Sequence, residues 1–458
     1  MKRNNIHSLV KSEQAVSVVI GALLIVSIMT LAAVQYQNNI IPAQEEETEF
    51  EHNREVRSSL YHLRSNIVAS SSSGEIRTTP VDVGTRFDQQ FIFGFLPAVH
   101  SPNPSGTFET YNVSDEEGLE VEITGAQGRG GASNYWQPTS TYEYSTSFAN
   151  YSVDYEHFQD APNVKYENSV MYDEVETASG TDTVIQTSQN IVQGNNINII
   201  MLSGDIQTST TQTVNVQAQP VSAPAQTVTI YSPPSAEGGP LQITIPTDLP
   251  QSDWCDLPAC GGGEGEGILN EQMASQGGNI NDFSYGGGEM TLRFQADETY
   301  TMKLSRVHLQ TQNDQSVTPQ IESQYVAWQG SERISFRENT RHTITAQVRD
   351  RYNNPVEGID TVAVATDSND EDECIGDFVS GTLGGIAGCP DNYQPGEKTS
   401  GENGEVTFFY DTPQVQDDTS INLQIELSKN SAYASLQEPG FRVASEESYE
   451  SENLQTTN

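Results

Sequence analysis

The chain has 458 residues, of which 63 are acidic and 21 are basic, and its formal net charge is -42 at pH 7. This balance excludes nucleic acid as a partner, because the sequence offers no basic patch to meet phosphates. The acidic residues are spread along the chain, so a single acidic tail does not account for the charge.

The first feature along the chain is an apolar run from Ala15 to Val34 that carries no charge and follows a basic stub, residues 1–14. Twenty helical residues reach about 30 Å, the thickness of the hydrocarbon core of a bilayer. Since cationic flanks stay in the cytoplasm, we predict a single-pass helix in the cell membrane, with the N-terminus inside and the C-terminal body extracellular. A cleaved secretory signal and a buried soluble helix are the alternatives.

A second, amphipathic helix is predicted over residues 43–73. Pro42 marks the end of the membrane helix or a kink in it. The apolar residues beyond it recur at helical spacing, and they are Val56, Leu60, Leu63 and Ile67. We assign the glutamates and arginines of this segment to the wet face. We interpret the segment as a stalk helix packed on the next domain, because a coiled coil would need more heptads.

The remaining chain is predicted to be mainly β. Short β-branched runs separated by Gly, Pro, Ser and Asn clusters indicate a β-sandwich over residues 75–312, and residues 90–96 are assigned to one of its strands. A second block, residues 318–430, has the size of an immunoglobulin-like β-sandwich. Residues 441–458 are predicted to be a disordered acidic tail.

The four cysteines form two local pairs, Cys255 with Cys260 and Cys374 with Cys389. On an oxidising exterior disulfides are the default interpretation, and free thiols are the alternative. Neither pair has the spacing of a zinc site. Connectivity stays open, because sequence alone does not determine it.

Two further kinds of site are candidates. Clustered loop oxygens are what Ca²⁺ requires, and they occur at Asp367, Asn369, Asp370 and Asp372. The segment lacks the glycine and the distal glutamate of an EF-hand, so a salt-hydrated loop is the favoured interpretation. Asn112 and Asn150 begin N-glycosylation sequons.

No catalytic motif is present: the sequence has no His-Glu-x-x-His and no Gly-x-Ser-x-Gly. Carboxylate pairs are so frequent that selecting a glycosidase dyad would be arbitrary. We therefore predict that the protein is not an enzyme and uses no cofactor.

The segment Lys11-Ser12-Glu13-Gln14-Ala15-Val16-Ser17 resembles the class III signal region of archaeal pilins and archaellins. The resemblance implies leader cleavage near Lys11 and Ser12 and an apolar helix that packs in a filament. Scarce Lys with abundant Asp and Glu resembles proteins of halophilic archaea, and residues 75–310 are similar to haloarchaeal surface proteins.

The segments Val348–Gly358 and Ser400–Phe408, which contain an Asn-Asn-Pro-Val turn and an Asn-Gly-Glu-Val strand start, resemble bacterial Ig-like modules of the invasin and intimin kind. Such modules are rigid spacers or adhesive surfaces, which is what the resemblance implies for the C-terminal block.

Together these features predict a membrane-anchored extracellular structural or adhesive surface protein of a halophilic archaeon. The alternative within that class is a pilin-like subunit assembled, with other surface or pilus subunits, into a type IV pilus-like filament. The alternative from another class is an exported glycan-binding protein or hydrolase.

Overall fold

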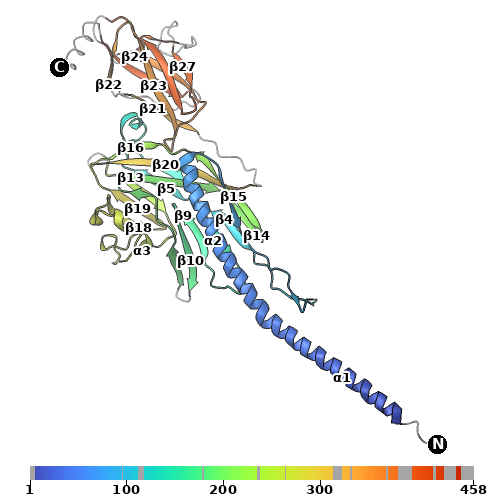
Figure 1. The fold of residues 1–458 in the computed structure, drawn as a ribbon. Coiled ribbons are helices and arrows are strands. Elements are labelled where there is room, and N and C mark those ends of the chain that lie inside the picture. Colours follow the sequence, from blue (N-terminus) through green and yellow to red (C-terminus); the bar gives the residue numbers. More distant parts are fainter. Residues whose placement is uncertain are drawn as a thin grey trace, which may run out of the picture.

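The computed structural model describes residues 6–94, 96–111, 118–177, 180–234, 238–263, 265–312, 322–330, 333–367, 370–379, 395–415, 419–427 and 440–444. The structure is mainly β, with one long N-terminal helix followed by several β-sheet units, and this confirms the predicted fold class (Figure 1).

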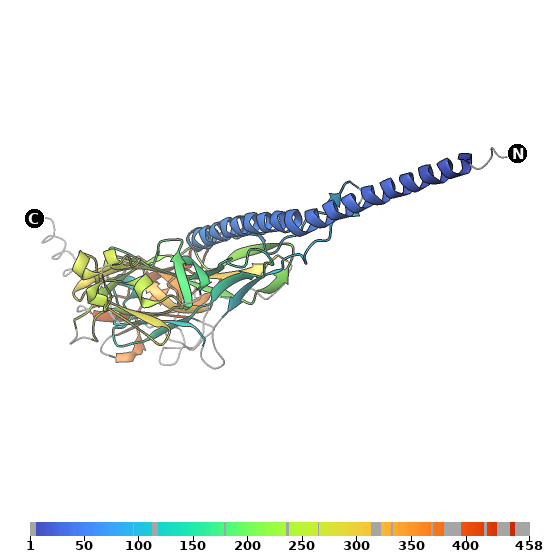
Figure 2. The ribbon, with the colours of Figure 1, turned by 90° about the horizontal axis from the view of Figure 1, so that it is seen from below.

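The N-terminal helix is a continuous rod that projects from the body (Figures 1 and 2). It consists of α1 (Ile6–Gln35), the π-helix η1 (Tyr36–Ile40) and α2 (Ile41–Ser73). In η1 the Ile41 N–H donates to the Tyr36 carbonyl, five residues back. Proline lacks an N–H and crowds the carbonyl four residues before it, so a wider turn ahead of Pro42 lets the helix continue.

The body contains three large sheets. The first has the order β1 (Arg77–Asp82), β15 (Thr213–Ser222), β20 (Glu298–Thr311), β13 (Asn196–Gly204), β12 (Val192–Gln193), and β20 also pairs with β16 (Thr227–Ser232), which pairs with β6 (Gln127–Gly128). The second has the order β11 (Gly180–Ile185), β10 (Val170–Thr177), β9 (Asn163–Glu167), β8 (Phe148–Val153), β4 (Gly106–Tyr111), β14 (Gln207–Thr210). The third has the order β18 (Ile280–Gly286), β19 (Glu289–Phe294), β17 (Gln242–Pro246), β5 (Glu120–Thr124), β7 (Tyr142–Ser145).

Small elements complete the body. The short helices are η2 (Gly130–Ala132), α3 (Gln251–Trp254), η4 (Pro258–Cys260), η5 (Asn270–Gln272) and η6 (Ala274–Gln276). Strands β2 (Phe91–Ile92) and β3 (Leu96–Pro97) pair only with each other. The assignment of residues 90–96 to a strand of the sandwich was therefore wrong, since this segment is a separate hairpin.

The body also differs from a simple antiparallel sandwich. It has three sheets, and β13 pairs with β20 in parallel, from Asn196 with Thr301 to Gly204 with Leu309. Parallel partners need a long crossover connection, and no local sequence pattern marks which distant strands will pair.

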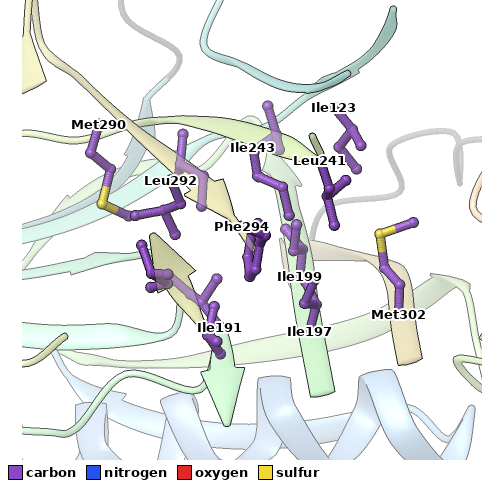
Figure 3. Packing of buried hydrophobic residues seen from close by; sticks show 14 of the residues in the cluster. Ile123, Ile191, Ile197, Ile199, Leu241, Ile243, Met290, Leu292, Phe294 and Met302 are labelled. Atoms are coloured by element: carbon purple, nitrogen blue, oxygen red, sulfur yellow. The ribbon is translucent and has the colours of Figure 1, made fainter. Parts of the chain in front are cut away.

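Alternation along β13 separates two hydrophobic cores. Ile197, Ile199 and Met201 face a core formed with the third sheet, whereas Ile200 and Leu202 face the opposite side. Figure 3 shows the first core, with Ile123, Ile191, Ile197, Ile199, Leu241, Ile243, Met290, Leu292, Phe294 and Met302 labelled.

The second core lies under α2. The predicted stripe is buried there together with apolar residues of the first and second sheets, among them Val307 and Leu309 of β20. β20 therefore contributes to both cores, because its first half turns Tyr300, Met302 and Leu304 to the core of Figure 3. The long central strand joins the helix layer to the rest of the body.

A second β unit lies at the end of the molecule opposite the N-terminus (Figure 1). Its two sheets enclose a separate core that includes Trp328, Phe408 and Tyr410. One sheet has the order β21 (Ser323–Trp328), β23 (Arg341–Asp350), β28 (Glu405–Asp411), β26 (Asp377–Phe378). The other has the order β22 (Arg333–Arg337), β30 (Gly440–Ala444), β29 (Thr419–Leu427), β24 (Asp360–Asp367), β25 (Asp370–Cys374), and β27 (Gly396–Thr399) pairs with β24.

The start of the predicted disordered tail needs correction. Residues 441–444 belong to β30, which pairs with β29 and, in parallel, with β22. Backbone pairing on both sides gives this short segment its order. Residues 445–458 lie outside the described residues.

A buried polar turn joins the two β units. The Asp350 carboxylate accepts hydrogen bonds from the Ser222 hydroxyl (2.6 Å) and from the backbone N–H groups of Tyr352 (2.8 Å) and Asn354 (2.9 Å). The Asn354 amide donates to the Leu304 carbonyl at 2.9 Å. The Asn-Asn-Pro-Val turn therefore holds the distal unit to β15 and β20 of the body.

This joint predicts a pH effect on stability. Burial raises the pKa of Asp350 to about 6, although the hydrogen bonds from Ser222, Asn354 and Tyr352 act to lower it. The folded-state pKa exceeds the unfolded value of about 3.9, so the folded protein binds more protons between about pH 4 and 6, and the contribution of Asp350 to stability falls as pH rises through that window. We expect the difference in melting temperature between Asp350→Asn and the unchanged protein to shift in favour of the variant from pH 4 to pH 7. The corresponding change in the free energy of unfolding is at most about 3 kcal/mol. Asp377→Asn, at an exposed position, is the control, and a difference that does not vary with pH would contradict the expectation.

Candidate membrane anchor and its junction with the body

The apolar half of the N-terminal helix has the surface of a membrane segment. It is the one helix in the described part of the chain that is long and apolar enough to cross a bilayer, and none of its apolar window is buried in the protein. Leu24 and Ile28 are 59% and 65% exposed. The hydroxyls of Ser27 and Thr30 donate to the carbonyls of Leu23 (2.7 Å) and Val26 (2.8 Å) one turn earlier. These polar groups therefore need no water, as a bilayer interior requires.

Two buried carboxylates fix the next part of the helix to the body. Glu45 is 3% exposed, and its carboxylate accepts hydrogen bonds from the Ser101 N–H (3.0 Å) and the Ser101 hydroxyl (2.9 Å). His157 Nε2 and His100 Nδ1 lie 2.8 and 3.0 Å from the same carboxylate. Burial opposes ionisation, but the hydrogen bonds from Ser101, His157 and His100 outweigh it and lower the pKa of Glu45.

Glu49 lies one turn further along α2 and is fully buried. Its carboxylate accepts three backbone N–H groups, from Glu156 (3.1 Å), His157 (2.9 Å) and Phe158 (2.8 Å). A carboxylate has enough acceptor sites for all three, and hydrogen bonds to a charged acceptor are stronger than neutral ones. The loop after β8 is therefore held directly by the helix.

His52 continues the same face of the helix. Its Nε2 lies 2.9 Å from the Asp82 carbonyl and its Nδ1 lies 2.5 Å from the Tyr155 hydroxyl. The carbonyl only accepts, so Nε2 carries the proton and Nδ1 accepts from Tyr155. Burial lowers the pKa of His52, which favours this neutral form.

We call Glu45, Glu49 and His52, with their partners in the loops at 100–101 and 155–158, the junction cluster. It joins the membrane-proximal part of α2 to two loops of the body through buried hydrogen bonds. Each of the three helix side chains has hydrogen-bond partners within the protein.

The sequence analysis missed the junction cluster. It assigned the glutamates to the wet face, which was wrong for Glu45 and Glu49. Arg57 and Arg64 also contact the body, through the Asp173 carboxylate and the Ser169 carbonyl (2.9 Å). The spacing of Glu45, Glu49, His52 and Val56 continues the apolar stripe and was the available signal. The prediction did not follow this spacing, because glutamates are rarely buried unless they have partners.

The cysteine prediction is confirmed for one pair. Cys255 and Cys260 form a disulfide between α3 and η4, with 6.0 Å between their Cα atoms. Cys374 in β25 is also disulfide-bonded, and Cys389 lies outside the described residues.

The other predicted sites are scattered. Asn150 lies in the middle of β8, where its amide donates to Glu109 at 3.1 Å, and Asn112 lies outside the described residues. Asp367 ends β24, Asn369 lies outside the described residues, and the side chains of Asp370 and Asp372 in β25 are likewise not described. Lys11 and Ser12 lie within α1, and their side chains are also outside the description. The described residues contain no group of three or more His, Cys, Asp or Glu side chains placed to hold a metal.

The body also has an acidic cleft of about 710 Å³. Its carboxylates come from three strands and one loop, and they are Glu120, Glu122, Glu143, Asp248 and Glu289. Its single aromatic lining residue, Phe148, is buried. The cleft therefore lacks an exposed ring of the kind on which a sugar would stack, among the residues that the structure describes.

The chain matches no family model and no curated protein. The resemblances to archaeal pilins and to Ig-like modules therefore stay predictions.

The junction cluster predicts a local response to mutation. Glu49→Ala removes the acceptor of three buried N–H groups, and each hydrogen bond to a charged group contributes about 1.5–3 kcal/mol. We expect much faster hydrogen exchange at the amides of residues 156–158, with strands of the distal unit unchanged. Glu46→Ala, at an exposed position on the same helix, is the matched control. Equal exchange in the two variants would show that Glu49 does not hold the loop.

Proposed function

We propose that this protein is a membrane-anchored extracellular surface protein with a structural or adhesive role and no catalytic activity. The observation that carries the proposal is the apolar helix, which is exposed along its length and clamped to a large β body at its far end. A helix of this length and composition is compatible with membrane anchoring.

The elongated arrangement supports a display role. The anchor projects at one end and the second β unit lies at the other, and both connections are buried and hydrogen-bonded (Figure 1). An outside location agrees with the basic stub at the N-terminus and with disulfides, which persist in oxidising compartments.

A pilin-like subunit is the second candidate. One observation favours it: residues 18–34 of α1 present exposed apolar side chains while α2 packs on the body, and such a helix could pack in the core of a filament as well as in lipid. The exported hydrolase or glycan-binding protein has only the acidic cleft in its favour.

Anchoring predicts a change in fractionation when charge enters the apolar run. Each acidic residue at the centre of a membrane helix costs about 2.5–3.5 kcal/mol on insertion scales. We expect the full chain to stay in the membrane fraction through high-salt washing, and Leu24→Glu with Ile28→Glu to move a large share into the aqueous fraction. Phe409→Glu, at an exposed position on the distal unit, should leave the distribution unchanged. An unchanged chain that stays in the aqueous fraction with residues 1–34 attached would contradict anchoring.

The residue at which the mature protein begins distinguishes an uncleaved membrane anchor from a pilin-like subunit. Mass spectrometry of the membrane-associated protein should find Met1 for an uncleaved anchor. A start near Glu13 or Ala15, together with recovery in detergent-free filaments, would favour the pilin-like subunit. A start beyond Ala33 would identify a released protein and overturn both.

A further inference from the structure

Large apolar side chains exposed outside the N-terminal helix are concentrated in one place. In the described part of the chain after Ser73 they are Ile76, Phe91, Phe93, Leu96, Val99, Val184 and Phe409. Four of these seven lie within nine consecutive residues. Clustered exposed apolar side chains of this kind mark an interaction site, whereas single exposed residues are ordinary.

We call residues 90–99, which contain β2 and β3, the apolar hairpin. Its register pairs Phe91 with Pro97 and Ile92 with Leu96, and it hydrogen-bonds to no other sheet in the described structure. The turn uses positive φ at Phe93 and Gly94. No charged residue occurs between Gln89 and Val99, in a chain with a net charge of -42.

Side-chain contacts hold the apolar hairpin beside the N-terminal helix at Tyr36 and Gln37. The Gln37 side chain accepts from the Val99 N–H at 3.0 Å and donates to the Val99 carbonyl. The Tyr36 hydroxyl donates to the Gln90 side-chain carbonyl at 3.4 Å. Figure 2 shows the hairpin beside the helix where α1 passes into η1, away from the main mass of the body.

The part of the helix that the hairpin contacts comes directly after the apolar run. Gln37 follows Val34 by three residues, which is about 5 Å along a helix. If the run from Ala15 to Val34 occupies the hydrocarbon core, then Gln37 and the hairpin lie in the zone of the lipid headgroups.

We propose that the apolar hairpin is a second membrane contact, whose exposed side chains insert into the interfacial region of the outer leaflet beside the helix. This inference rests on the proposed anchoring. The occupant is lipid because the hairpin contacts the helix at Gln37, next to the end of the apolar run, and because residues 90–99 carry no charge that would oppose entry into the interface. The depth is limited to the interface, because the hairpin has unpaired backbone edges that hydrocarbon would not tolerate.

The second contact would fix the orientation of the body. A single helix can tilt and rotate within the bilayer and carry the body with it, whereas a second contact at the membrane surface restricts both motions. The junction cluster then transmits that orientation to the body, because Glu45 holds Ser101, two residues beyond Val99.

The test places a tryptophan on the hairpin. The full chain is reconstituted in phosphatidylcholine vesicles in molar salt, with or without lipids brominated on carbons 6 and 7 of an acyl chain. Trp136, Trp254 and Trp328 are 0%, 0% and 8% exposed within the β units, so they supply a baseline remote from lipid. The variants are Phe91→Trp and Val99→Trp on the hairpin, Leu24→Trp in the membrane helix and Phe409→Trp on the distal unit.

We expect the brominated lipid to remove most of the emission that each hairpin tryptophan adds, as it does for Leu24→Trp, and to leave Phe409→Trp at the baseline. Bromines placed deeper, on carbons 11 and 12, should quench Phe91→Trp less and Leu24→Trp more. Quenching of Leu24→Trp without quenching of either hairpin variant overturns the second contact and leaves anchoring intact.

Two other outcomes also overturn it. If Leu24→Trp is not quenched, anchoring itself fails and the hairpin proposal fails with it. If the hairpin tryptophans are shielded from bromine and their emission shifts to the blue as the protein-to-lipid ratio rises, the patch contacts a second copy of the chain instead of lipid.

Discussion

One face of α2 is buried along its whole length, and the arrangement of the molecule depends on that contact. The face begins at Ile41, changes from apolar to polar between Glu45 and Asn53, returns to apolar from Val56 to Ile67, and ends at Ser71. The apolar part packs on β20 and the second sheet as any amphipathic helix would. The polar part is different, because burying a carboxylate is costly unless donors replace water. The loops at 100–101 and 155–158 supply those donors, so these loops have their positions because the helix carries Glu45 and Glu49.

The same rule holds for the other buried acids of the described structure. Glu167 accepts from the Thr247 hydroxyl and from the Asp248 N–H (2.8 Å), yet burial still raises its pKa to about 7. Asp173 contacts Arg57 of the helix. In molar salt the Debye length is about 3 Å, so repulsion among the many surface carboxylates is screened while hydrogen bonds of this length are not. In such salt, a strongly acidic chain can therefore join its helices and loops through hydrogen bonds to buried carboxylates, while the repulsion among its surface carboxylates is screened.

Much of the fold could be predicted from the sequence, because the spacing of apolar residues and the composition of a segment can be read within that segment alone. The apolar run, the stripe from Val56 to Ile67 and the two β units follow from spacing and β-branched content. The parallel pairing of β13 with β20 did not follow, since about a hundred residues separate the partners. The apolar hairpin was assigned to the sandwich because Phe91 and Ile92 have the composition of a core strand, and only the structure shows that Phe91 is 52% exposed while Ile92 is buried. The Asn-Asn-Pro-Val turn was correctly identified as a turn, but its contact with Ser222 depends on a strand of another unit.

The two buried connections bear on the proposed display role. A surface protein that must hold its distal unit at a defined distance from a membrane needs both, since a flexible link at either end would allow the distal unit to fold back. The joint is built from the Tyr144 hydroxyl donating to the Arg351 carbonyl (2.9 Å) and from stacked Tyr135 and Tyr325 rings 4.4 Å apart, in addition to Asp350. These contacts act together with the hydrogen bonds of Asp350 in holding the two β units to each other.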